Sequence, residues 1–151
     1  MLELATPTTE SPVLLVLDTN VVLDWLVFRD PGCDALAGAL TAGAARWVAT
    51  QAMRDELERV LMRGSLDAWR PDASALWAAW ARSANMVPAP PQPLPRSPRC
   101  TDPDDQPFID LALHVGASAL LSRDRAVLRC ARGARALGLA IMPPAVWGAR
   151  R

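Results

Sequence analysis

The chain has 151 residues, 51% of them hydrophobic, and its formal net charge at neutral pH is zero. That length is typical of one domain with a core large enough to fold alone. Its three cysteines are far apart in the sequence, which argues against a disulfide framework and against a zinc site. The chain contains no lysine, which argues against a P-loop and against phosphoaspartate chemistry that relies on a lysine.

The first twelve residues differ in composition from the rest of the chain. Residues 1–12 carry two acidic residues, two prolines and no base, without the charged start and apolar stretch of a signal peptide. We expect them to form a flexible N-terminal tail. Later apolar runs, such as 13–17 and 111–121, are too short or too interrupted to span a bilayer. These features predict a cytoplasmic protein that does not enter a membrane.

Strands and helices are predicted to alternate along the rest of the chain. Short apolar runs predict buried strands at 13–17, 47–49, 86–87, 119–121 and 139–142. Apolar residues at helical spacing predict helices at 19–28, 34–40, 51–63, 72–84, 105–116 and 124–132. Six prolines in segment 88–98 predict an extended loop. The alternation predicts one α/β domain over 13–147, with a central parallel sheet between two layers of helices.

Two aspartates come just after predicted strands. Asp18 directly follows strand 13–17, and Asp124 lies three residues after strand 119–121. The carboxyl ends of parallel strands meet at one edge of the sheet, where ligands bind in open α/β folds. We therefore expect both carboxylates at the same edge. Each of them alone is equally compatible with a helix N-cap, and that alternative stays open.

Glu56 is a third candidate because it lies within the apolar stripe of helix 51–63. A carboxylate at such a position is costly unless something compensates its charge, and a metal ion would do so. The alternative is a glutamate at the edge of the helix that reaches solvent. Asp55 and Arg59, on the same helix, are four residues apart and have the spacing of a solvent-exposed ion pair.

Three further acids, Asp102, Asp104 and Asp105, lie at the start of helix 105–116. Acidic residues are favourable there because of the helix dipole, but one is enough for a cap. Asp105 is the best placed of the three, since it shares a helical face with Ile109 and Ala112. Asp102 or Asp104 stays open as a further ligand.

Together these positions predict a cluster of carboxylates at one edge of the sheet. Carboxylates that close repel one another strongly in a partly dry site, so protons or divalent cations must neutralise them. Ligands that are all oxygen favour Mg²⁺ or Mn²⁺ over zinc. Such a site can activate a water molecule and stabilise charge on a phosphodiester. The predicted catalytic and metal-binding residues are Asp18, Glu56, Asp105 and Asp124.

Four short motifs in the chain resemble, in order and spacing, those of PIN-domain nucleases. They are VLDTNVV at 16–22, DELERVL at 55–61, DPDDQPFIDLAL at 102–113 and LLSRD at 120–124. The resemblance covers roughly residues 13–142. Within that family the motifs resemble most the toxin components of bacterial toxin–antitoxin pairs.

The resemblance implies a Rossmann-like sheet of order 3-2-1-4-5 and cleavage of single-stranded RNA that depends on Mg²⁺ or Mn²⁺. It assigns metal binding to the same four carboxylates, and it gives Asn20 and Ser122 supporting roles in orienting them or the attacking water. It also implies a protein antitoxin as partner, and it leaves a homo-oligomer open.

The end of the chain is basic, since residues 120–151 carry seven arginines and one acid, whereas residues 1–119 carry nine arginines and 15 acids. Several of these arginines recur at helical spacing along helix 124–132 and are predicted to bind the RNA backbone. The candidates are Arg123, Arg125, Arg129 and Arg132. The alternative is a solvated helix face that keeps the protein soluble.

Two other functions are compatible with parts of this pattern. An RNase H-like nuclease also uses four acids, but its fold opens with an antiparallel meander, whereas here a helix is predicted after the first strand. A catalytically silent PIN module that binds RNA or protein is the alternative from a different class. The intact acid set argues against the silent module.

Overall fold

The computed structural model describes residues 11–91, 94 and 96–151. The predicted N-terminal tail, 1–12, therefore lies almost wholly outside the described residues. So do residues 92, 93 and 95 of the predicted proline-rich loop 88–98. The described part of that loop contains neither helix nor strand, as expected for a segment so rich in proline.

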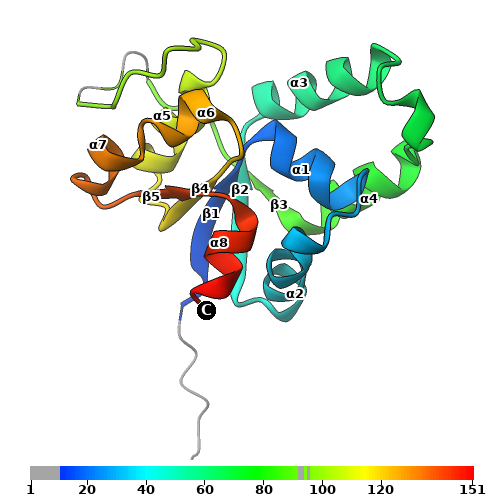
Figure 1. Ribbon diagram of the computed structural model, residues 1–151, viewed down its shortest axis with the longest axis horizontal. Helices are drawn as coiled ribbons and strands as arrows, with labels where there is room; N and C mark the ends of the chain where they lie inside the picture. Colours follow the sequence, from blue (N-terminus) through cyan, green and yellow to red (C-terminus); the bar gives the residue numbers. More distant parts are fainter. Residues whose placement is uncertain (1–10, 92–93, 95) are drawn as a thin grey trace, which may run out of the picture.

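In the described part of the chain, five strands form one parallel sheet in the order β3-β2-β1-β4-β5 (Figure 1). The strands are β1 (Val13–Leu17), β2 (Ala45–Ala49), β3 (Ala84–Met86), β4 (Ala119–Leu121) and β5 (Ala140–Met142). The predicted parallel sheet and its order are confirmed. Because β1 and β4 are short apolar runs with no charged residue, they occupy the buried centre of the sheet.

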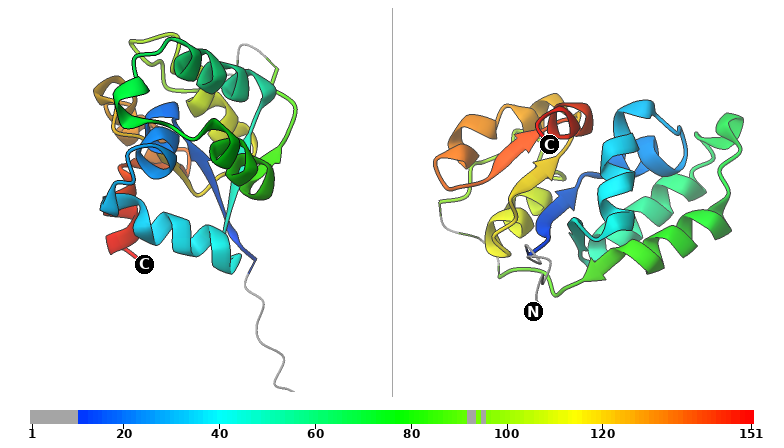
Figure 2. Two further views of the ribbon diagram at one scale, coloured as in Figure 1. Left: turned by 90° about the vertical axis from the view of Figure 1, so that its right-hand side faces the viewer. Right: turned by 90° about the horizontal axis from the view of Figure 1, so that it is seen from below.

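Helices cover both sides of the sheet. The α-helices are α1 (Thr19–Leu26), α2 (Asp34–Ala42), α3 (Gln51–Met62), α4 (Ala73–Ser83), α5 (Gln106–His114), α6 (Arg125–Leu128), α7 (Ala131–Arg135) and α8 (Pro144–Ala149). Two 3₁₀ turns, η1 (Pro31–Cys33) and η2 (Asp67–Trp69), complete the set. Figures 1 and 2 show α5, α6 and α7 on one side and α1 to α4 on the other, which confirms the three-layer α/β/α architecture.

Two predictions about the last part of the chain are wrong. The single helix predicted at 124–132 is two short helices, α6 and α7, because the Cys130 amide bonds tightly back to the Val127 carbonyl at 2.9 Å. Helix α8 was not predicted at all. It begins at Pro144, a residue that suits the first helical position because its missing N–H would have no partner there.

Tryptophans tie the sheet to the helices on one side. Trp47 on β2 is almost fully buried and makes edge-to-face contacts with Trp25 of α1 and Trp80 of α4, at centroid distances of 5.8 Å and 4.6 Å. Such contacts stabilise a core beyond the area they bury. Trp80 is 5% exposed and belongs to the hydrophobic core.

The topology places a switch point at the middle of the sheet. The chain builds β2 and β3 on one side of β1, then crosses over and adds β4 and β5 on the other side. The carboxyl ends of β1 and β4 therefore flank the position at which ligands bind in folds of this class. None of the helices in the described ranges is long and apolar enough to cross a membrane.

Candidate active site

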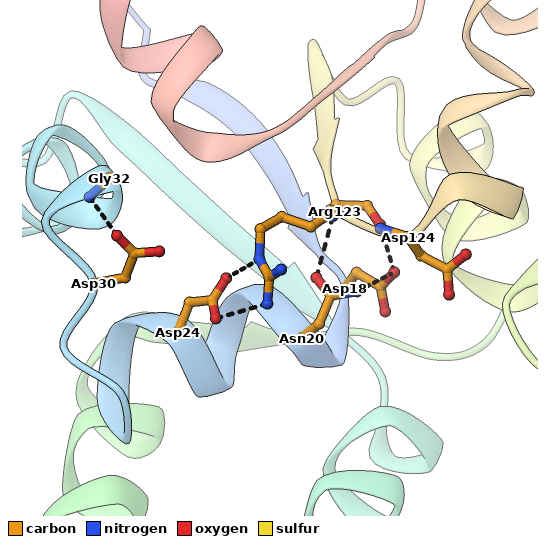
Figure 3. Close-up of polar contacts among 8 residues, drawn as sticks. Asp18, Asn20, Asp24, Asp30, Gly32, Arg123 and Asp124 are labelled. Atoms are coloured by element: carbon orange, nitrogen blue, oxygen red, sulfur yellow. Dashed lines mark hydrogen bonds and ion pairs between the residues drawn. The ribbon is translucent and has the colours of Figure 1, made fainter.

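Asp18 lies at the carboxyl end of β1, on the edge predicted from the sequence. Its backbone amide extends the ladder by bonding to Leu121 of β4 at 3.0 Å. The residue occupies the N-cap position of α1, but its side chain makes no capping hydrogen bond. Instead, the carboxylate accepts hydrogen bonds from Ser122 at 2.7 Å and Asn20 at 3.3 Å (Figure 3). The capping alternative therefore does not account for this aspartate.

Ser122 joins Asp18 to Asp124. Its buried hydroxyl donates to the Asp18 carboxylate and accepts the backbone N–H of Asp124 at 3.0 Å. Asp124 also caps α6, since its side chain accepts from the Ala126 amide at 2.8 Å. One oxygen of Asp124 thus serves the helix, and the carboxylate lies beside that of Asp18 in Figure 3. The supporting role expected of Ser122 and Asn20 is consistent with these bonds.

Asp105 comes from a different part of the chain but faces the same two acids. It occupies the N-cap position of α5 and makes no side-chain capping bond. Its Oδ2 is buried and has no hydrogen-bond partner among the described residues. A buried carboxylate oxygen without a donor is rare, because the lost hydration is not replaced. In the described part of the chain the buried Oδ2 of Asp110 is also without a donor, but beside Asp18 and Asp124 a bound cation or a shared proton would supply the partner that Asp105 lacks.

The electrostatics of the three acids reflect their proximity. The pKa of Asp18 rises from its ordinary value of 3.8 to about 6, chiefly through burial, with smaller contributions from the charges of Asp124 and Glu56. The hydrogen bond from Ser122 opposes that rise. The pKa of Asp105 rises to about 7 through burial and then through the charges of Asp18 and Asp124. The predicted mutual repulsion is therefore present in this fold.

Glu56 lies on α3, in the second turn after a helix start capped by Thr50, whose hydroxyl accepts from the Met53 amide. The glutamate is half-buried, and Thr19 of α1 donates a short hydrogen bond to its carboxylate. It also contributes to the raised pKa of Asp18. The structure thus brings Glu56 to the rim of the cluster, rather than leaving it as a glutamate on the solvent side of α3.

Asp102 and Asp104 are exposed, and they are less well placed as ligands than Asp105. The Asp102 side chain accepts from the Asp104 amide at 3.0 Å, which is a local turn bond. Asp102 also contributes to the raised pKa of Asp105, so it lies near the cluster. Asp104 lines a cleft between α3 and the start of α5.

The donor atoms suit a divalent cation. They are all oxygen, one of them is buried without a partner, and two of the acids have pKa values raised by burial and, to a smaller extent, by neighbouring charges. The present side-chain positions do not form a coordination shell, however. Among residues 11–91, 94 and 96–151, no three histidine, cysteine, aspartate or glutamate side chains are arranged to hold one metal ion.

Arg123 has a structural contact that the sequence did not reveal. Its guanidinium forms a two-point ion pair with Asp24 of α1, and Asp24 is only 3% exposed (Figure 3). The backbone N–H of Arg123 also bonds to the Asn20 side chain at 3.2 Å, so the residue links α1 to the segment after β4. The sequence signal for Asp24 was its position one helical turn after Asn20.

The expected arginine stripe is not continuous. Arg125 lies on α6, Arg129 caps the end of that helix and Arg132 lies on α7, so the three do not belong to one continuous helix. All three are exposed. Their role in binding RNA therefore remains a proposal, without the helical geometry that motivated it.

A buried polar network that the sequence does not predict anchors the segment leading to Asp105. The Gln106 amide donates to Ser97 at 3.1 Å and to Asp110 at 2.9 Å, and its oxygen accepts from the Cys100 amide at 2.7 Å. Asp110 is fully buried. The signal was the spacing of Gln106 and Asp110, four residues apart on α5. This network fixes the backbone just before the acid cluster.

Comparison with known proteins agrees with this geometry. No curated protein matches the chain. Residues 14–126 match the sequence profile of the PIN domain, a span that contains all of the acids described above and four of the five strands. PIN domains are generally nucleases that use divalent metal ions. The matched span covers well over half of the chain, and on that ground the chain belongs to the PIN-domain family.

Proposed function

We propose that this protein is a ribonuclease that depends on Mg²⁺ or Mn²⁺ and hydrolyses phosphodiester bonds of single-stranded RNA. The observation that carries the proposal is the orphaned, buried oxygen of Asp105, on an acid whose pKa is raised by burial and then by the charges of Asp18 and Asp124. Three elements of the chain, the ends of β1 and β4 and the start of α5, converge to create this unfavourable arrangement. A fold that keeps such repulsion has a site suited to cations.

Asp18, Glu56, Asp105 and Asp124 are the residues that would hold the ion. When bound, the ion would supply positive charge to the phosphate under attack and lower the pKa of a water nucleophile. Ser122 and Asn20 keep the Asp18 carboxylate turned toward Asp124, and Thr19 keeps Glu56 at the rim. Because these hydrogen bonds already restrict the rotation of the Asp18 and Glu56 side chains, less conformational entropy is lost when an ion binds.

The direct test is cleavage of a labelled single-stranded RNA with Mg²⁺ or Mn²⁺, and with chelator as the blank. Asp18→Asn keeps the shape of the side chain and should reduce turnover by at least about a hundredfold, because the lost charge displaces the ion. Glu56→Gln should also reduce turnover. Asp55→Asn, on the next residue of α3, is the matched control and should not. Full turnover in Asp18→Asn would overturn the assignment.

The biological role we propose is that of a toxin neutralised by a protein antitoxin. Support comes from the motif resemblance to PIN-family toxins. Induced expression in a bacterial host should arrest growth, and expression of Asp18→Asn should not. A small neighbouring gene with a DNA-binding motif, whose product copurifies with this chain and restores growth, would identify the antitoxin. Equal growth with both proteins would contradict the toxin role and leave the nuclease activity to be judged by cleavage.

A catalytically silent module that binds RNA or protein is the second candidate. The observation that favours it is that no three acidic side chains in the described residues are arranged around one ion. The same cleavage assay separates the two. Binding of RNA without metal-dependent cleavage, in a protein that melts cooperatively, would favour the silent module.

A further inference from the structure

A cleft of about 410 Å³ opens beside the acid cluster, between α3 and the segment that leads into α5. Glu56 stands at this cleft, so the cleft is continuous with the proposed catalytic site. Arg59 and Arg63 line the same wall, three and seven residues after Glu56. These spacings put all three side chains on one face of α3, over about 10 Å of helix axis.

The two arginines have no ion-pair partner among residues 11–91, 94 and 96–151. The pairing expected between Asp55 and Arg59 is not formed, since Asp55 accepts instead from Gln51 at 3.0 Å. Other arginines do have structural contacts: Arg54 of the same helix lies over the Trp77 ring at 4.1 Å. Arg59 and Arg63 are exposed and are left available to a ligand.

The charge of the cleft depends on Glu56. If the Glu56 carboxylate binds the ion held by the acid cluster, the charged groups left in the cleft are two guanidinium groups and one carboxylate, that of Asp104 on the opposite wall. Guanidinium groups bind phosphate in a two-point geometry that suits a nucleic acid backbone. The floor contains the apolar side chains of Met53 and Phe108, which are nearly buried and give the cleft a rigid base.

We propose that Arg59 and Arg63 bind phosphates of the RNA strand next to the bond that is cut, and that the strand leaves the acid cluster along α3. This inference rests on the proposed function, because it takes RNA as the substrate. It differs from the sequence-based expectation, which put the strand on Arg125, Arg129 and Arg132. Arginines near a helix C-terminus also interact favourably with the helix dipole. That interaction does not explain why these arginines line a cleft and follow Glu56 along one face of the helix.

The test is anisotropy of a fluorescein-labelled single-stranded RNA, titrated with protein in EDTA over a series of salt concentrations, so that cleavage does not compete. Each phosphate contact removed should lower the salt slope by roughly 0.7 for a single strand. The double variant Arg59→Gln with Arg63→Gln, called the α3 variant below, should therefore lower the slope by about 1.4 and weaken binding at least about tenfold. Arg59→Lys with Arg63→Lys keeps the charges and should retain most of the slope.

The matched control is Arg46→Gln with Arg82→Gln. Both residues are exposed and lie together at another cavity, near the amino end of β2, so the change in net charge is the same away from the acids. An unaltered slope in the α3 variant, or an equal loss in the control, would overturn the proposal. So would a loss of slope that occurs only in a variant with Arg125, Arg129 and Arg132 all changed to Gln. The proposal would also be overturned if polyglutamate bound tightly at the cleft and RNA did not displace it. That result would favour an acidic protein as the partner.

Metal response and cleavage separate this proposal from the proposed function. The Mn²⁺-induced rise in melting temperature should be the same in wild type and in the α3 variant, because the carboxylates remain. If wild type binds RNA with the expected slope but does not cut it, the proposed function fails and the binding site stands. If wild type cuts RNA, and the α3 variant cuts it with unchanged KM and slope, the binding site fails and the proposed function stands.

Discussion

Replacing Asp18 by Asn should stabilise the metal-free protein at neutral pH. Asp18 is 3% exposed and its pKa is about 6, against an ordinary value of 3.8. A difference of about two pKa units corresponds to about 3 kcal/mol, which is the cost of keeping Asp18 ionised in the folded state. An uncharged side chain of the same shape avoids that cost.

The pKa of about 6 already includes the opposing effect of the hydrogen bond from Ser122, so that bond is not subtracted a second time. The expected gain is therefore about 3 kcal/mol. In a domain of this size, each kcal/mol shifts the melting temperature by roughly 2–4 °C. We expect Asp18→Asn in EDTA at pH 7.5 to melt roughly 6–12 °C above wild type.

The dependence on pH tests the cause. Because the folded pKa of Asp18 is raised, the wild-type fold carries no penalty below about pH 4, and the penalty grows until the pH exceeds about 6. The advantage of Asp18→Asn, measured by calorimetry in EDTA, should thus shrink as the pH falls from 7.5 to 4.5. Asp34→Asn, at an exposed acid on α2, is the control and should shift little. A variant that melts no higher than wild type at pH 7.5, or whose advantage does not depend on pH, would refute this reasoning.

Three further outcomes are expected. Millimolar Mn²⁺ should raise the melting temperature of wild type by mass action, and should raise that of Asp18→Asn with Asp124→Asn much less; equal shifts would argue against a shared site. The Mn²⁺ affinity, measured by titration calorimetry, should fall as the pH is lowered from 8 to 6, because Asp105, with a pKa of about 7, takes up a proton. An affinity that does not change over this pH range would exclude Asp105 as a metal ligand. Arg123→Gln should lower the free energy of unfolding in urea by about 2 kcal/mol, because the buried Asp24 loses its partner; the loss is moderate because the Arg123 side chain is half-exposed. Adding Asp24→Asn to that variant should restore most of the lost stability. An unchanged free energy of unfolding in Arg123→Gln would contradict a structural ion pair.

The sheet was predictable because its strands carry a strong local signal. The runs at β1 and β4 are short, apolar and without charge, and their predicted bounds agree with those observed. The division between α6 and α7 had no such signal. Val127, Cys130 and Ala134 are all buried and are three or four residues apart, which is also the spacing of one continuous helix. Helix α8 has an ambiguous sequence signal, because two consecutive prolines are typical of the end of an element as well as of a helix start.

The acids were predictable from strand ends, but their partners were not. Asp18 and Asp124 follow strands of known direction, so topology alone puts them at one edge. The bond between Thr19 and Glu56 joins residues 37 positions apart, and the pair of Asp24 and Arg123 joins residues 99 positions apart. Contacts at that separation depend on how α1 lies against α3 and the end of β4, which a single sequence does not specify.

Ser122 shows how the fold sustains acids that repel each other. Its backbone N–H continues the sheet by bonding to Met142 of β5, so its position is set by the ladder and not by the site. From that fixed position its hydroxyl serves both Asp18 and the Asp124 amide. The same bond lowers the pKa of Asp18, which keeps that carboxylate largely ionised at neutral pH despite its burial. In the proposed site, the sheet itself would therefore hold the acids in position for a cation, and the repulsion that remains is what a bound cation would relieve.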